Sequence, residues 1–83
     1  MIHDLKTWPG MFANVAAGHK THEIRKMDRP FMIGDVLRLR EWDPYAAEYT
    51  GHVIDVTVTF VTCGGEWGIP ADLCVMSIRR VPT

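Results

Sequence analysis

Alternation of hydrophobic and polar residues predicts two long β-strands in the middle of the chain. Between residues 36 and 42, Leu37, Leu39 and Glu41 alternate with Val36, Arg38, Arg40 and Trp42, so both leucines are expected to face the core. From residue 52 onward the even positions carry the large apolar side chains, which are Ile54, Val56, Val58 and Phe60. A strand with this period has one buried face and one exposed face.

Turn-forming residues separate these strands from each other and from a last strand. Asp43-Pro44 begins a reversal that is expected to end near Thr50-Gly51, and the glycine-rich segment 63–70 is interpreted as a loop. The last strand is predicted from about residue 74 to residue 81. Its inward side chains are expected to be Cys74, Met76 and Ile78.

The N-terminal part of the chain predicts a strand, a short helix and a second short strand. Residues 2–7 are extended, and Pro9 then ends the strand and opens a helix, because proline is tolerated in the first helical turn. The helix is expected over roughly 9–17, and residues 21–26 follow as a strand. The apolar face of the helix carries Phe12, Val15 and Ala16. Trp8 is expected in the core, where it would hold the helix against the barrel, and a surface on which a base stacks is the alternative for this residue.

One helix after a first strand, followed by a meander, predicts an α+β fold based on a small barrel that closes on itself. We expect five to six mostly antiparallel strands and one main helix near the N-terminus. The 83 residues predict a single domain, 1–83, and the 47% hydrophobic content argues against intrinsic disorder. No stretch approaches the ~18 apolar residues of a membrane span, and no signal segment begins the sequence. We therefore expect a cytoplasmic monomer that does not contact membranes.

The net charge of −1 conceals an uneven distribution of charged side chains. Residues 18–40 hold six basic and three acidic side chains, whereas the remaining residues hold three basic and seven acidic ones. A protein that coats long duplex DNA usually has a larger overall excess of positive charge. The local excess is compatible with a cleft for a short anionic or nucleotide-like ligand. A solvated charged face is the competing interpretation.

Residues 18–25 carry a family motif. Gly18-His19-Lys20-Thr21-His22-Glu23-Ile24-Arg25 fits the pattern G-x-K-x-x-E-x-R, the signature of the ASCH superfamily of PUA-like barrels. The flanking segments resemble a small bacterial and phage family called domain of unknown function 3850. These segments are Leu5-Lys6-Thr7-Trp8-Pro9, Phe31-Met32-Ile33-Gly34-Asp35, Leu39-Arg40-Glu41-Trp42-Asp43-Pro44 and Glu48-Tyr49-Thr50-Gly51. The resemblance covers about residues 3–62 and weakens after Cys63.

This resemblance implies a PUA-like (ASCH) β-barrel with a cleft between the first helix and the barrel mouth, where RNA or a modified nucleoside binds. It places Lys20, Glu23 and Arg25 in the cleft. From spacing alone, an exposed Glu23–Arg25 ion pair with a solvated Lys20 remains the alternative. Lys6, one strand away, and Arg29, just past the strand, can add positive charge, and Trp67 in the glycine-rich loop offers a stacking surface. The ligand-binding candidates are thus Lys20, Glu23, Arg25, Lys6, Arg29 and Trp67.

Two other functions remain open. One ASCH-like branch resembles amidohydrolases that deacetylate N4-acetylcytidine with a lysine, a threonine and a glutamate, and another is linked to RNA cleavage. Lys20 and Glu23 are the catalytic candidates for either reaction, although the amidohydrolase branch has threonine where this chain has Glu23. The third function is a protein-interaction adaptor. Its contact face would consist of Arg38, Arg40 and Trp42.

No metal site or cofactor is expected. The only conceivable zinc ligands are His19, His22, Cys63 and Cys74. Their spacing lacks a C-x-x-C pair, and His22 alternates with Glu23 and so is expected to point toward the core. The segment 63–68 is glycine-rich but precedes neither the lysine nor the helix of a phosphate-binding loop.

Overall fold

The computed structural model describes residues 1–82, which form five strands and one short helix. In chain order these elements are β1 (Ile2–Thr7), α1 (Pro9–Ala16), β2 (His22–Lys26), β3 (Val36–Asp43), β4 (Glu48–Cys63) and β5 (Leu73–Arg80). Among the described residues, no helix has both the length and the apolar character needed to cross a membrane.

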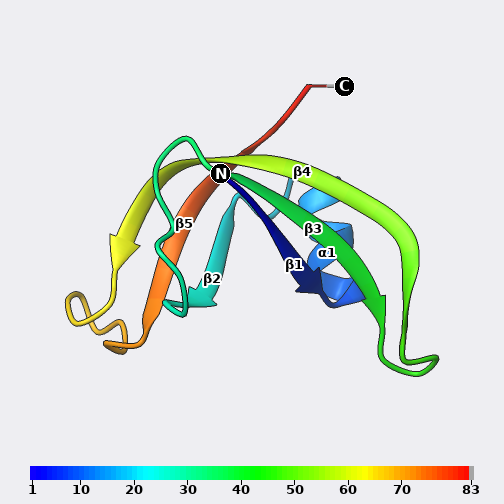
Figure 1. Cartoon of the computed structure of the whole chain (residues 1–83), viewed down its shortest axis with the longest axis horizontal. Coiled ribbons are helices and arrows are strands. Elements are labelled where there is room, and N and C mark those ends of the chain that lie inside the picture. The colour runs from blue at the N-terminus through cyan, green and yellow to red at the C-terminus, as the bar shows by residue number, and fades with distance from the viewer. Residues whose placement is uncertain (83) are drawn as a thin grey trace.

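The strands form one curled sheet in the order β1-β3-β4-β5-β2. Strand β1 runs parallel to β3, and the other neighbouring pairs are antiparallel. Figure 1 shows the strands arching from a common ridge, so that the sheet encloses a concave side like half of a barrel. The prediction of a barrel that closes on itself is therefore wrong. Strands β1 and β2 are the two edges, and side chains, not a backbone ladder, connect them.

Alternation along the central strands determines which residues form the core. Leu37 and Leu39 on β3 are completely buried, as the sequence pattern predicts, and each lies opposite an apolar residue of β4. Phe31, from the segment between β2 and β3, joins the same core. The core consists of Leu5, Phe12, Val15, Phe31, Leu37, Leu39, Ile54, Val56, Val58, Cys74, Met76 and Ile78.

Phe60 does not follow the alternation that the sequence predicts for β4. The register between β4 and β5 shifts between Val58 and Phe60, and Phe60 is 57% exposed. An irregularity of this kind inserts a residue into one strand, so the following side chains change sides. Val61 consequently packs against the core in place of Phe60.

The β3–β4 turn is shorter than predicted. Asp43 Oδ1 accepts hydrogen bonds from the next backbone N–H groups, including that of Tyr45 at 2.9 Å, which fixes the start of the turn. Ala47 then adopts a positive φ of 53°, and β4 begins at Glu48, not near Gly51. Gly51 lies within β4, with φ of 95°, close to a register shift between β3 and β4.

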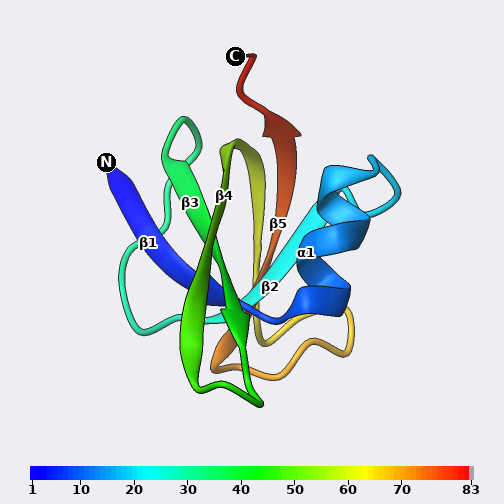
Figure 2. The ribbon, with the colours of Figure 1, turned by 90° about the vertical axis from the view of Figure 1, so that its right-hand side faces the viewer.

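Helix α1 begins with Pro9, and its buried residues are Phe12 and Val15. The helix lies against β3, and Figure 2 shows it to one side of the curled sheet. Trp8 is the N-cap residue in an extended conformation and makes no side-chain capping bond. The expectation that Trp8 is a core residue is wrong, because 53% of Trp8 is exposed. The indole therefore stands at the surface where β1 passes into the helix.

Candidate functional site

Strand β2 brings Glu23 and Arg25 to the same side because side chains two residues apart share a face of a strand. Glu23 is only 4% exposed, whereas its neighbours His22 and Ile24 are exposed. The alternative of a solvent-exposed Glu23–Arg25 pair is therefore wrong. The expectation that His22 points toward the core is also wrong, since the buried position of this strand belongs to the carboxylate.

Two cations neutralise the buried carboxylate of Glu23. Oε1 accepts a hydrogen bond from Lys20 Nζ at 2.9 Å, and Oε2 accepts one from Arg25 Nε at 2.7 Å. Lys20 Nζ also donates to the backbone carbonyl of His22 at 2.6 Å. A buried carboxylate without such partners is strongly destabilising, so these contacts explain how Glu23 is tolerated here. The group of Lys20, Glu23 and Arg25, which we call the edge cluster, has a net charge of +1.

Arg25 also connects the two edges of the sheet. Its Nη2 donates to the backbone carbonyl of Lys6 at 2.9 Å and lies 3.4 Å from Thr7 Oγ1. Lys6 and Thr7 end strand β1, while Arg25 belongs to β2. The side chain thus satisfies a carbonyl of β1 at the edge where a closed barrel would have a backbone hydrogen bond.

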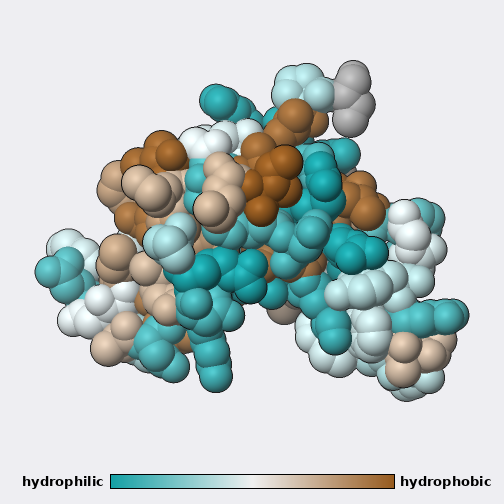
Figure 3. All heavy atoms as spheres, in the orientation of Figure 1, coloured by the Kyte–Doolittle hydropathy of each residue, from teal (hydrophilic) through white to brown (hydrophobic). Residues whose placement is uncertain are grey.

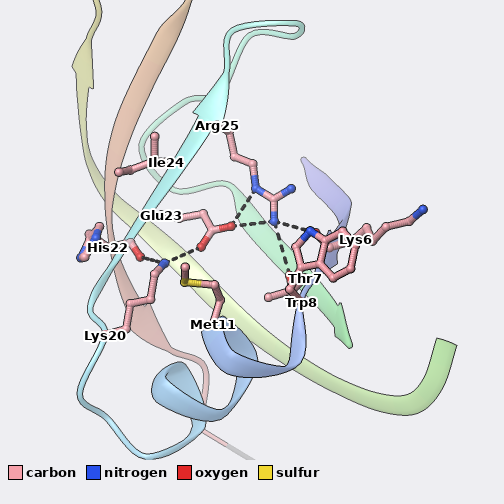
Figure 4. A pocket seen from close by; sticks show the side chains of 9 residues that line it. All are labelled: Lys6, Thr7, Trp8, Met11, Lys20, His22, Glu23, Ile24 and Arg25. Carbon is pink, nitrogen blue, oxygen red and sulfur yellow. Dashed lines mark hydrogen bonds and ion pairs between the residues drawn. The ribbon is translucent and has the colours of Figure 1, made fainter. Parts of the chain in front are cut away.

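A pocket of about 500 Å³ opens beside the edge cluster. Figure 4 shows the edge cluster facing the start of α1 across this pocket. Its apolar lining comes from Trp8, Met11 and Ile24, all more than half exposed. The polar lining comes from Lys6, Thr7, Lys20, His22, Glu23 and Arg25. An aromatic surface beside cationic groups suits a planar ligand that also carries hydrogen-bond acceptors or negative charge.

The cations of the edge cluster retain hydrogen-bonding capacity. An ammonium group has three donors, and Lys20 uses two of them on protein oxygens. Arg25 uses Nε and Nη2, and within residues 1–82 its Nη1 has no hydrogen-bond partner. Figure 4 shows this nitrogen outside the dashed contacts. Both side chains can therefore hold Glu23 and donate to a ligand at the same time.

The structure unites three of the six predicted ligand-binding residues and separates the others. The edge cluster brings Lys20, Glu23 and Arg25 together, as the motif implies. Lys6 lines the pocket, but its ammonium lies 3.9 Å from the centre of a Trp42 ring and not in the cluster. Arg29 lines a neighbouring pocket. Trp67, 86% exposed with a positive φ, is not among the residues that line either pocket.

Sequence reasoning favoured a core position for Trp8 over a stacking surface and did not find Met11, so it missed the apolar wall of the pocket. Trp8 and Met11 are three residues apart at the start of α1, which places them on the same side of the helix. The sequence pattern held a signal for this wall, because Phe12 and Val15 define the buried face of the helix and Trp8 and Met11 lie outside that face. A large apolar side chain that lies at a strand–helix junction and outside the buried face of the helix is a candidate for the wall of a pocket.

A second buried carboxylate lies away from the pocket. Asp35 Oδ2 is 2.8 Å from His3 Nε2 and accepts a hydrogen bond from the backbone N–H of Met32 at 3.0 Å. The hydrogen bond with His3, followed by that from Met32, lowers the pKa of Asp35 to about 2 despite the opposing effect of burial. The His3 ring also packs edge-on against Phe31. This His3–Asp35 pair fastens β1 to the segment before β3 and lines neither pocket.

Hydropathy alone does not single out a binding site. Figure 3 shows several hydrophobic patches separated by hydrophilic groups on one face of the molecule. The outer side of β3 carries basic residues too, but Arg38 is paired with Asp55 at 3.1 Å and Arg40 lies 4.1 Å from the Tyr49 ring centre. The Arg38–Asp55 pair raises the pKa of Arg38. Neither arginine lines the pockets at the open edge.

Fold and site together define a small half-barrel domain with a cation-lined pocket at its open edge. The chain belongs to the family described as Domain of unknown function (DUF3850), whose model matches residues 2–78. This confirms the resemblance that the segments around the motif indicate. The chain is also similar to an uncharacterized 12.9 kDa protein in the GpA 3′ region of Escherichia phage P2. The two are 36% identical over 66 residues, which cover 80% of this chain and 59% of the phage protein.

Proposed function

We propose that this domain binds a nucleotide or single-stranded RNA in the pocket at its open edge. The observation that carries the proposal is the pairing of an exposed aromatic and apolar wall with two cations that keep free donors. Bases stack on aromatic side chains, and arginine or lysine holds the backbone or the edge of a base. The PUA-like (ASCH) relationship implied by the motif points in the same direction.

The first test compares two exposed tryptophans. Trp8 lines the pocket, whereas Trp67 lies outside it, so Trp8→Ala and Trp67→Ala remove the same kind of side chain from different places. We expect Trp8→Ala to weaken binding of a mixed tetranucleotide RNA roughly tenfold or more, because each stacked base contributes about 1–3 kcal/mol. Trp67→Ala is expected to bind like the parent protein. Calorimetric titrations of both variants make the comparison, and equal losses would contradict the proposal.

The salt dependence of the same titration identifies the contacts. Binding through phosphates releases counterions from the nucleic acid. This release is less favourable at a higher salt concentration, so the affinity falls as salt is added. Because only a few cations line the pocket, we expect the logarithm of the affinity to fall with a shallow but measurable slope against the logarithm of the salt concentration. Binding independent of salt would indicate recognition of the nucleoside alone.

A second candidate function is hydrolysis of an acylated nucleoside. It is favoured by one observation, namely that Thr7, Lys20 and Glu23 line the same pocket. Water would add to the amide carbonyl, and the products would be acetate and the free amino nucleoside. The Thr7 hydroxyl, however, already donates to the carbonyl of Leu5 at 3.3 Å. Intact N4-acetylcytidine after long incubation with concentrated protein, measured by chromatography, would eliminate this function.

A further inference from the structure

A second pocket of about 450 Å³ adjoins the first along the open edge of the half-barrel. The two pockets share Lys6, Ile24 and Arg25. These residues come from both edge strands, so the pockets follow each other along the junction of β1 and β2. Arg25 is therefore a boundary residue that both pockets can reach.

The second pocket differs from the first in its lining. It contains two further basic residues, Lys26 and Arg29, together with the acidic residues Asp4 and Asp28. Arg29 Nε is 3.2 Å from Asp28 Oδ1, but both side chains of this pair are well exposed. Exposed ion pairs contribute little stability, so Arg29 can exchange its partner for a ligand anion at low cost. The first pocket thus provides a stacking wall, and the second provides accessible positive charge.

We propose that the two pockets form one groove for an extended single-stranded nucleic acid longer than one nucleotide. A base occupies the pocket beside Trp8, a linking phosphate lies at the free Nη1 of Arg25, and the following backbone reaches Lys26 and Arg29. This inference rests on the proposed function and adds the length of the ligand. A mononucleotide fills only the first pocket, whereas a longer strand uses both.

Comparison of ligand lengths tests the proposal. Titrations use adenosine monophosphate and the trinucleotide ApApA, and the corresponding uridine, cytidine and guanosine ligands cover differences in base preference. We expect the preferred trinucleotide to bind at least roughly tenfold more tightly than its mononucleotide, which is the effect of one additional charge-assisted contact.

Paired double variants locate the additional contact. Lys26→Ala/Arg29→Ala is expected to lower trinucleotide affinity to the mononucleotide level while mononucleotide affinity stays unchanged. Arg38→Ala/Arg40→Ala removes the same charge from the outer face of β3. This control variant is expected to leave both the mononucleotide and the trinucleotide affinity unchanged. Unfolding curves of both variants confirm that they fold.

Equal affinity for both lengths, or equal effects of the two double variants, overturns the groove but leaves the proposed nucleotide pocket intact. Failure of every mononucleotide and trinucleotide to bind overturns the proposed function and the groove together.

Discussion

Two buried carboxylates at opposite ends of strand β1 show what distinguishes a structural anchor from a binding site. Asp35 pairs with buried His3 near the start of the strand, and Glu23 pairs with Lys20 and Arg25 near its end. Both acids satisfy the same requirement, because an unpaired buried charge is strongly destabilising. They differ in their surroundings: buried His3 and the exposed N-terminal ammonium of Met1 hold Asp35 outside both pockets, whereas the cations around Glu23 line an open pocket.

This difference means that a buried charge alone does not identify a site. Whether the charge and its partners line a pocket does. Around Asp35, hydrogen bonds from His3, Met32 and the N-terminal ammonium hold β1 against the segment before β3. Around Glu23, the same physics orients two cations that line a pocket and keep donors beyond those used on protein oxygens. Four perturbations separate the roles of these two regions, and they are given from the largest expected effect on stability to the smallest.

Glu23→Gln is expected to cause the largest loss. The substitution keeps the size of the side chain but leaves the two cations of the edge cluster without their counter-charge. We expect the free energy of unfolding to fall by about 3 kcal/mol and ligand binding to be lost. Urea denaturation and calorimetry measure the two effects. Glu66→Gln, at an exposed loop position, is the control, and equal stability of the two variants would contradict the account.

Asp35→Asn is expected to reduce stability by about 1–3 kcal/mol without changing ligand affinity. The variant retains the shape of the side chain but weakens its hydrogen bond with His3. Denaturation curves and titrations with the same RNA provide both quantities. A loss of affinity in a folded Asp35→Asn protein would show that the two carboxylates do not have separate roles.

Acid is expected to remove the stabilisation that ionised Asp35 contributes. The pKa of Asp35 is lowered from 3.8 to about 2, so the folded state holds the proton less tightly than the unfolded state. The resulting stabilisation is fully present above about pH 4 and is lost as the pH falls toward 2. Denaturant midpoints across this range should therefore decline in the parent protein and decline less in Asp35→Asn. Identical slopes for the two proteins would exclude this origin.

Lys20→Ala is expected to have the smallest effect on stability of these four perturbations, because Glu23 keeps its contact with Arg25. Ligand affinity should nevertheless fall roughly tenfold, since a charge-assisted contact is removed. Thermal unfolding and calorimetry are again measured together, with Arg38→Ala as a control outside the pocket. A large loss of stability with unchanged affinity would assign Lys20 to the fold alone.

The sequence predicted the local features of the fold better than its closure. Period-two patterning identified Leu37 and Leu39 as core residues because each strand face is set by neighbouring residues alone. The prediction that Phe60 is buried was wrong because the register shift depends on how β4 pairs with β5, and the hydrophobic pattern of one strand carries no information about its partner. The prediction of a closed barrel was wrong for a related reason, since pairing of β1 with β2 depends on the distance between these two strands in space.

The candidate site was predicted in its charges but not in its shape. The motif and strand alternation placed Glu23 and Arg25 together, and Lys20 joins them from the segment after α1. The same reasoning could not show that Glu23 is buried, since burial follows from where β2 lies at the sheet edge. Nor could chain proximity show that the Lys6 ammonium lies over Trp42 instead of joining the cluster.

The most direct test of the account is an amide-shift titration by NMR, with the labelled protein and a short mixed-sequence single-stranded RNA. Free nucleosides, including N4-acetylcytidine, follow in the same experiment. The account predicts that shifts concentrate at residues 18–25 and at Trp8 and Met11 across the pocket. Shifts confined to residues 38–42, or no shifts with any of these ligands, would contradict the claim that the open edge of the half-barrel is a nucleotide site.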